Sequence, residues 1–148
     1  MRALMLATMT LALTATVSAA DNPFIGTWKL NTAKSKRDAA LLKIQNRTVV
    51  YAANGSVITA VVTTDGKAQA PVTYDGREHL VDSATGLYTH ATSTANDRTL
   101  ETEFKKSGKV VGTRKNSLSP DGRTMTVVMD VAQADGTRVH SVAVYDKQ

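Results

Sequence analysis

The chain has 148 residues, with 18 lysines and arginines against 13 aspartates and glutamates, and a net charge of +5 at pH 7. It has no cysteine, which excludes disulfides, thiol nucleophiles and cysteine-ligated metals. The basic groups are scattered and not interleaved with aromatic residues, so the charge does not predict a nucleic-acid platform. We expect a protein that binds no nucleic acid, with a modest charge that permits attraction to an anionic envelope surface.

The first twenty residues have the pattern of a cleaved secretory signal. Arg2 supplies a positive charge, residues 3–17 form an apolar run interrupted only by threonines, and residues 18–20 read Ser-Ala-Ala. The run is short for a membrane span of about 20 apolar residues. We predict a signal peptide at residues 1–20 and one domain at residues 21–148, exported to the periplasm or the extracellular space.

Turn dipeptides recur along the rest of the chain at nearly regular intervals. Glycine, asparagine and aspartate tolerate the positive φ that tight hairpins need, so such pairs between alternating segments predict hairpins. The pairs are Asn54-Gly55, Asp65-Gly66, Asp75-Gly76, Thr85-Gly86, Asn96-Asp97, Ser107-Gly108, Asp121-Gly122 and Asp135-Gly136. Segments rich in Val, Thr, Ile and Tyr separate them, as half-buried strands require. The predicted strands are 25–31, 44–53, 56–64, 67–74, 77–82, 87–93, 98–105, 109–118, 123–132 and 137–147.

One connection, residues 32–43, is too long for a simple hairpin. Residues 39–42 read Ala-Ala-Leu-Leu and favour a short helix, with Ser35 or Asp38 as its cap. Ten hairpin-linked strands fit a closed up-and-down barrel or a two-sheet sandwich, and the lack of long crossovers after residue 43 favours the barrel. The predicted fold is therefore all-β, a ten-stranded antiparallel up-and-down β-barrel with one short helix between strands 1 and 2.

Both ends of this predicted barrel resemble a known family. Residues 24–30 read FIGTWKL, similar to the opening strand of the intracellular lipid-binding proteins, the fatty-acid-binding family of the calycin barrels. Residues 144–147 read VYDK, similar to the terminal strand of the same family. The resemblance implies a ten-stranded calycin-like barrel with a helical lid after the first strand.

Three departures accompany this resemblance. The family commonly holds a ligand carboxylate with an Arg-x-Tyr near its end, and this chain has Tyr145 but Ala143 at the arginine position. The connection 32–43 is too short for the family's pair of helices, and a secretory signal is foreign to intracellular members. An exported bacterial lipocalin-like barrel, sharing the Gly-x-Trp of Gly26 and Trp28, fits these departures better. For Trp28 itself we expect a structural role, plugging one end of the barrel and ordering the termini.

The interior of such a barrel can hold a ligand when its side chains do not fill it. The chain has one Trp, four Tyr and two Phe, and small residues crowd its strands. Either a cavity remains, or the barrel flattens until its two faces touch. On residues 123–132, Met125 and Met129 alternate with polar residues, so we predict that both point inward.

Two arginines lie on the apolar face of their predicted strands, Arg98 and Arg114. An inward guanidinium needs a partner, and a ligand carboxylate or phosphate would satisfy it bidentately. A side chain that reaches the rim, or an internal pair with Glu or Tyr, would also satisfy it. Of the two, Arg114 is the better candidate anchor, with Tyr145 and Tyr74 as hydroxyl partners.

The sequence carries no motif of a known reaction. His79 and His90 would approach each other across one hairpin, but two imidazoles give too few ligands for zinc, and we expect them at the surface with His140. No Gly-x-Ser-x-Gly turn, phosphate loop or His-Glu-x-x-His helix occurs. We expect no enzymatic activity, cofactor or metal.

These features predict a monomeric, noncatalytic protein that binds a small hydrophobic or amphipathic, lipid-like molecule inside an exported lipocalin-like barrel. The alternative is a filled β-barrel that acts as a periplasmic or envelope protein-interaction or inhibitor module. The candidate ligand-binding residues are Arg114, Tyr145, Tyr74, Met125, Met129 and Arg98.

Overall fold

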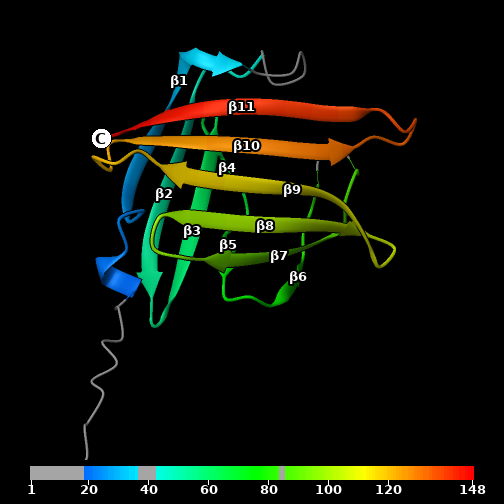
Figure 1. The fold of residues 1–148 in the computed structure, drawn as a ribbon, viewed down its shortest axis with the longest axis horizontal. Helices are drawn as coiled ribbons and strands as arrows, with labels where there is room; N and C mark the ends of the chain where they lie inside the picture. The colour runs from blue at the N-terminus through cyan, green and yellow to red at the C-terminus, as the bar shows by residue number, and fades with distance from the viewer. Residues whose placement is uncertain (1–18, 37–42, 84–85) are drawn as a thin grey trace, which may run out of the picture.

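The computed structural model describes residues 19–36, 43–83 and 86–148. These residues form one 3-10 turn, η1, and eleven strands that belong to a single sheet (Figure 1). Their bounds are η1 Ala19–Asp21, β1 Gly26–Lys36, β2 Arg47–Asn54, β3 Val57–Thr64, β4 Lys67–Ala68, β5 Val72–Tyr74, β6 Glu78–Leu80, β7 His90–Ala95, β8 Thr99–Lys106, β9 Lys109–Leu118, β10 Thr124–Ala132 and β11 Arg138–Lys147. The turns have the predicted chemistry: both residues of Asp65-Gly66 and of Ser107-Gly108 have positive φ, which suits the twist of a two-residue hairpin.

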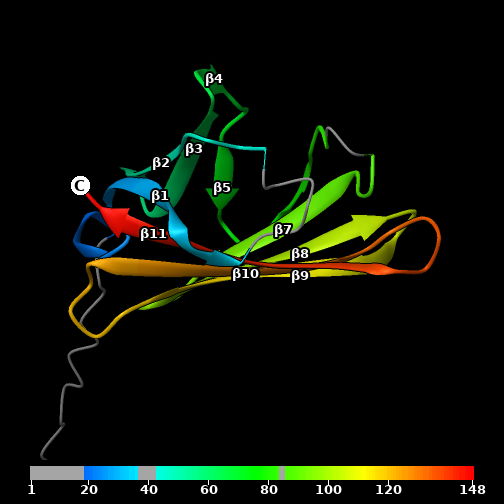
Figure 2. The same ribbon diagram turned by 90° about the horizontal axis from the view of Figure 1, so that it is seen from above.

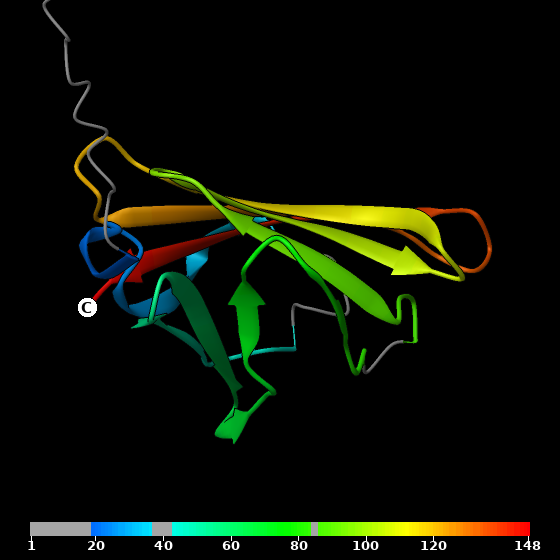
Figure 3. The same ribbon diagram turned by 90° about the horizontal axis from the view of Figure 1, so that it is seen from below.

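All strand pairs are antiparallel, in the order β4-β3-β2-β1-β11-β10-β9-β8-β7-β6, with β5 also paired to β3. The sheet curls so that β2 to β5 lie over one face of the long layer formed by β7 to β11 (Figures 2 and 3). β1 joins the two layers, because residues 26–29 pair with β2 and residues 28–31 pair with β11. The predicted all-β, antiparallel up-and-down architecture is confirmed as a curled half-barrel.

The half-barrel has a seam between β5 and β7. No strand pairing joins these two strands within the described residues, although the Gly76 amide donates a hydrogen bond of 2.8 Å to the Ser93 carbonyl across the gap. The predicted strand 67–74 is divided here into β4 and β5, because Pro71 has no N–H to donate to a ladder. The strand count is therefore eleven rather than ten.

The predicted connection 32–43 is shorter than expected, because residues 32–36 continue β1 to Lys36. A register shift between Asn31 and Lys36 accommodates extra residues in β1, where it pairs with β11. The Ser35 hydroxyl holds this bulge: it donates to the Asn31 carbonyl at 2.6 Å and accepts the Val144 amide at 2.9 Å. The helix predicted at residues 39–42 lies outside the described residues and stays a prediction.

The predicted signal peptide also lies outside the described residues, except for Ala19 and Ala20 in η1. It stays a prediction. Among the residues described, no helix has the length and apolar character needed to cross a bilayer.

The buried side chains form two clusters between the layers. The larger contains Phe24, Trp28, Leu30, Val49, Tyr51, Ile58, Ala60, Tyr74, Leu100, Met125 and Tyr145. The smaller contains Ala91, Phe104 and Val131, with half-buried Val81, Leu87, Tyr88, Val111 and Met129 against it.

Trp28 connects the two ends of the described chain, as expected for a structural plug. It is fully buried, its Nε1 donates to the Phe24 carbonyl at 2.8 Å, and the Lys147 ammonium lies 5.2 Å from the centre of its ring. The same ammonium donates to the Pro23 carbonyl at 2.9 Å. Gly26, with φ of 125°, adopts a backbone conformation that favours glycine and turns the chain into β1.

At Gly112 the neighbouring strand β10 leaves no room for a side chain on β9, and a substitution there tests this packing. A Cβ at this position would lie 2.5 Å from the Asp130 carbonyl oxygen and 2.8 Å from the Val131 Cα. We expect Gly112→Ala to lower the free energy of unfolding by about 1–3 kcal/mol, measured by urea denaturation, because backbone atoms would have to move. Thr113→Val, on the exposed face of the same strand, is the control and should stay within about 0.5 kcal/mol of wild type. A Gly112→Ala protein as stable as wild type would contradict this close approach.

Candidate functional site

Arg114 on β9 places a guanidinium between the two layers of the half-barrel. Residues alternate along β9, so Gly112, Arg114 and Asn116 share its inner face. One terminal nitrogen of Arg114 lies 3.3 Å from the Tyr74 hydroxyl on β5 and 3.2 Å from the Thr102 hydroxyl on β8. The guanidinium carbon lies 5.7 Å from the centre of the Phe104 ring, within range of a cation–π interaction.

The positive charge of Arg114 has no carboxylate partner among the described residues. Its Nε is inaccessible to solvent and has no hydrogen-bond partner there, although the residue as a whole is half-buried. Burial is the largest influence and acts to lower the pKa of the guanidinium, whereas the negative charge that Tyr74, Tyr51, Tyr88 and Tyr145 acquire when they ionise raises it, so that the pKa lies above its usual value. The interior therefore contains a permanent cation that only neutral groups solvate.

A chain of hydroxyls continues from Arg114 toward the seam. The Thr102 hydroxyl that contacts Arg114 is 2.9 Å from the Ser93 hydroxyl on β7. Both residues are 2% exposed. A cavity of about 120 Å³ lies at the seam, lined by β5, the segment 79–81, Ala91 and Ser93. Ser93 thus connects this cavity to the Thr102–Arg114 contact.

A second polar contact joins the layers next to the first. The Asn116 Nδ2 donates to the Tyr51 hydroxyl of β2 at 2.8 Å, and the Tyr51 hydroxyl donates to the Met125 sulfur at 3.7 Å. Burial, followed by the neighbouring Tyr74, raises the pKa of Tyr51 well above its usual value, so Tyr51 stays neutral. The layers touch through polar side chains as well as apolar ones, so the barrel is flattened at this point.

Most of the predicted site residues share this interior. Tyr74 contacts Arg114 directly, and Met129 is the neighbour of Arg114 on β10. Met125 is fully buried and pairs with Tyr145 across β10 and β11. The predicted inward orientation of Met125 and Met129 is confirmed, whereas the role of all four residues in ligand binding stays a prediction.

Arg98 does not face the interior, so this part of the prediction is wrong. It lies in the turn before β8, where the alternation of a strand has not yet begun. Its side chain is exposed, and its guanidinium donates to the Ser119 carbonyl.

The sequence pattern did not identify four polar residues of this interior: Tyr51, Ser93, Thr102 and Asn116. Asn116 lies two residues after Arg114 on β9 and therefore on the same face, so the alternation of side chains along the strand could have identified it. The contacts with Tyr51 and Ser93 depend on which strands face each other, and no local pattern reveals this.

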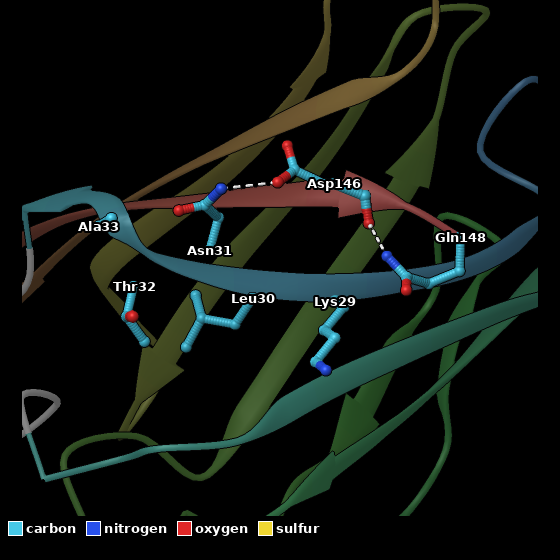
Figure 4. A pocket seen from close by; sticks show the side chains of 7 residues that line it. All are labelled: Lys29, Leu30, Asn31, Thr32, Ala33, Asp146 and Gln148. Carbon is cyan, nitrogen blue, oxygen red and sulfur yellow. Dashed lines mark hydrogen bonds between the residues drawn. The ribbon is translucent and has the colours of Figure 1, made fainter.

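His79 borders the cavity at the seam, but no histidine forms a hydrogen bond with Arg114 among the described residues. His79 lies 2.9 Å from Asp75 at the surface, and the described residues contain no group of three or more potential metal ligands. An open groove of about 280 Å³ lies along β1 and the end of β11 (Figure 4). Asn31 and Asp146 point toward each other there, with 2.6 Å between Nδ2 and Oδ2. This hydrogen bond is the main cause that lowers the pKa of the Asp146 carboxyl group.

Comparison with solved structures shows that the chain has a fold like that of the fatty-acid-binding proteins. No protein-family model and no curated protein sequence matches the chain. A Schistosoma mansoni fatty acid binding protein in complex with arachidonic acid superposes with a TM-score of 0.66 at 16% identity, over 88% of this chain and 99% of that one. A fatty acid-binding protein from Drosophila melanogaster brain gives 0.63 at 20% identity, over 83% and 98%. A zebrafish ileal bile acid-binding protein complexed with cholic acid gives 0.62 at 12% identity, over 86% and 100%.

These similarities show the fold alone, and the predicted resemblance in fold to the fatty-acid-binding barrels is confirmed. At such low identity they do not transfer a ligand to this chain.

Replacing Arg114 tests whether its charge serves the fold. Because a buried unpaired charge opposes folding, we expect Arg114→Met to raise the free energy of unfolding by about 1 kcal/mol or more, measured by urea denaturation without added ligand. Arg98→Met, which removes only an exposed hydrogen bond, should lower it by less than about 1 kcal/mol. A loss of more than about 2 kcal/mol in Arg114→Met would mean that the guanidinium is mainly a structural link between the layers.

Proposed function

We propose that this chain binds a small amphipathic molecule with an anionic head group inside the half-barrel, and that it catalyses no reaction on it. The observation that carries this proposal is the Arg114 guanidinium, which lies in the interior with a buried, unpartnered Nε and no carboxylate beside it among the described residues. A carboxylate or phosphate would supply the charge-assisted hydrogen bonds that hydroxyl groups provide only weakly.

The apolar part of such a ligand has suitable surfaces next to Arg114. Phe104 lies under the guanidinium, and Met129 lies beside it on β10. A methionine thioether adapts to ligands of different shape. Two of the similar structures hold arachidonic acid and cholic acid, both amphipathic carboxylic acids, which supports the same class of ligand here.

A ligand of lipid size requires the layers to separate. The cavity at the seam has about 120 Å³, whereas small-molecule sites usually have about 300–1,000 Å³. The seam between β5 and β7 lacks strand pairing in the described part of the chain, so movement there breaks few backbone hydrogen bonds. We propose that the ligand head group replaces the Tyr74 hydroxyl at Arg114 while β5 moves outward.

The filled-barrel alternative has an observation of its own. The layers touch at Tyr74–Arg114 and Tyr51–Asn116, and the side chains of Leu80 and Val110 are 80% and 54% exposed to solvent. A rigid, filled barrel with exposed apolar side chains would suit a protein-interaction or inhibitor module. Ligand binding distinguishes the two functions.

The binding test compares an acid with an alcohol of the same chain length. We expect laurate to raise the Tm of the wild-type protein with dose and to displace a fluorescent fatty-acid analogue. Arg114→Met should bind laurate about ten- to hundredfold more weakly, because a hydrogen bond to a charged group is lost. Its affinity for lauryl alcohol should change little, and Arg98→Met should behave as wild type. No Tm shift with any member of a broad lipid panel would contradict ligand binding and favour the filled-barrel function.

Export is a further part of the proposal, supported by the pattern of residues 1–20. We expect protein purified from its own host to have the mass of a chain that begins at Asp21 and to be recovered outside the cytoplasm. Native mass spectrometry of the same sample should detect a small molecule bound to the protein. A cytoplasmic protein that retains residues 1–20 would contradict export without affecting the ligand proposal.

A further inference from the structure

Asn116 presents a buried hydrogen-bond acceptor that the described residues leave unused. The residue is 3% exposed and lies two positions beyond Arg114 on the inner face of β9. Its Nδ2 donates to the Tyr51 hydroxyl at 2.8 Å, whereas its Oδ1 is inaccessible to solvent and has no hydrogen-bond partner.

The neighbouring hydroxyl does not satisfy this oxygen. Tyr51 accepts its hydrogen bond from the Asn116 Nδ2 and donates its own proton to the Met125 sulfur. The great majority of buried polar groups in proteins have a partner, and leaving an acceptor unpaired opposes folding. A leucine of similar size would avoid this cost, so the amide needs another explanation.

Arg114 and Asn116 together define what a ligand must offer. Their Cα atoms are about 7 Å apart, from the rise of about 3.4 Å per residue in an antiparallel strand. Arg114 contributes a buried unpaired donor, Nε, and Asn116 contributes a buried unpaired acceptor, Oδ1. A plain carboxylate has only acceptors and would leave the Asn116 oxygen unpaired. A ligand that satisfies both residues carries an anion and, a few bonds away, a hydrogen-bond donor.

We propose that Asn116 determines ligand specificity by accepting a hydrogen bond from a hydroxyl group close to the ligand's acid group, so that the site selects hydroxylated acyl acids over plain ones. This inference rests on the proposed binding of an anionic amphiphile near Arg114. It assigns the anion to Arg114 and the adjacent hydroxyl to Asn116.

The test measures the affinity of laurate and of β-hydroxylaurate by isothermal titration calorimetry. Wild type should bind β-hydroxylaurate roughly tenfold or more tightly than laurate, because the hydroxyl satisfies a buried acceptor. In Asn116→Leu the affinity for β-hydroxylaurate should fall and that for laurate should rise, so the preference disappears. Ser117→Ala, on the opposite face of β9, is the matched control and should keep the wild-type preference.

A second variant guards against a folding defect in Asn116→Leu. Asn116→Ala also removes the acceptor without adding bulk, and its binding should show the same loss of preference. Far-UV circular dichroism and the Tm establish that each variant is folded.

The outcomes separate this inference from the function on which it rests. Binding of neither acid by wild type would overturn the proposed function and the role of Asn116 with it. Equal affinity for the two acids, or an unchanged preference in folded Asn116→Leu and Asn116→Ala proteins, would overturn the role of Asn116 alone.

Discussion

The unneutralised charge of Arg114 is the constraint that determines which groups can surround it in the interior. A guanidinium cannot lose its proton in a protein, so the groups around it must solvate it. Here those groups are the hydroxyls of Tyr74 and Thr102 and the face of the Phe104 ring, all uncharged. Hydroxyls stabilise a cation without cancelling its charge. The interior therefore keeps an electrostatic preference for an anion that an Arg–carboxylate pair would have removed.

The same charge explains why the core consists of two clusters. Arg114, Thr102 and Ser93 form a polar line across the interior. On one side of it lies the larger cluster, which Tyr74 joins, and on the other lies the smaller cluster, which Phe104 joins. Small side chains on the inner faces let the layers approach until the tyrosines of β2 and β5 reach β9. The barrel is flattened because polar contacts from one layer find partners on the other.

The strands were predictable because their turns depend on local chemistry. A pair such as Asp65-Gly66 specifies a tight hairpin whatever surrounds it. The alternation of side chains along β9 correctly predicted that Arg114 points inward. The predictions failed where the structure depends on a contact distant in sequence, or on the exact residue at which a strand begins. The segment 32–36 is a strand because Ser35 binds Val144, 109 residues away in sequence, and Arg98 precedes the first residue of its strand.

The position of the cation also determines where a ligand's apolar tail can lie. In the family that the chain's ends resemble, an arginine near the last tyrosine commonly holds the ligand carboxylate, but β11 has Ala143 there and the cation stands on β9 instead. A head group held at Arg114 would have the two clusters on either side. The larger cluster has eleven buried residues and includes the Trp28 contacts that join the ends of the described chain, so opening it would cost much apolar burial.

The smaller cluster has three buried residues and is covered in part by the half-buried side chains of Val81, Leu87 and Tyr88. Ala91 of this cluster and Val81, which packs against it, also line the cavity at the seam, where β5 and β7 are not paired within the described part of the chain. Regions with few buried apolar contacts open at the lowest free energy. A tail would therefore enter between β5 and β7 and lie against Phe104 and Met129, leaving the larger cluster to keep the barrel folded.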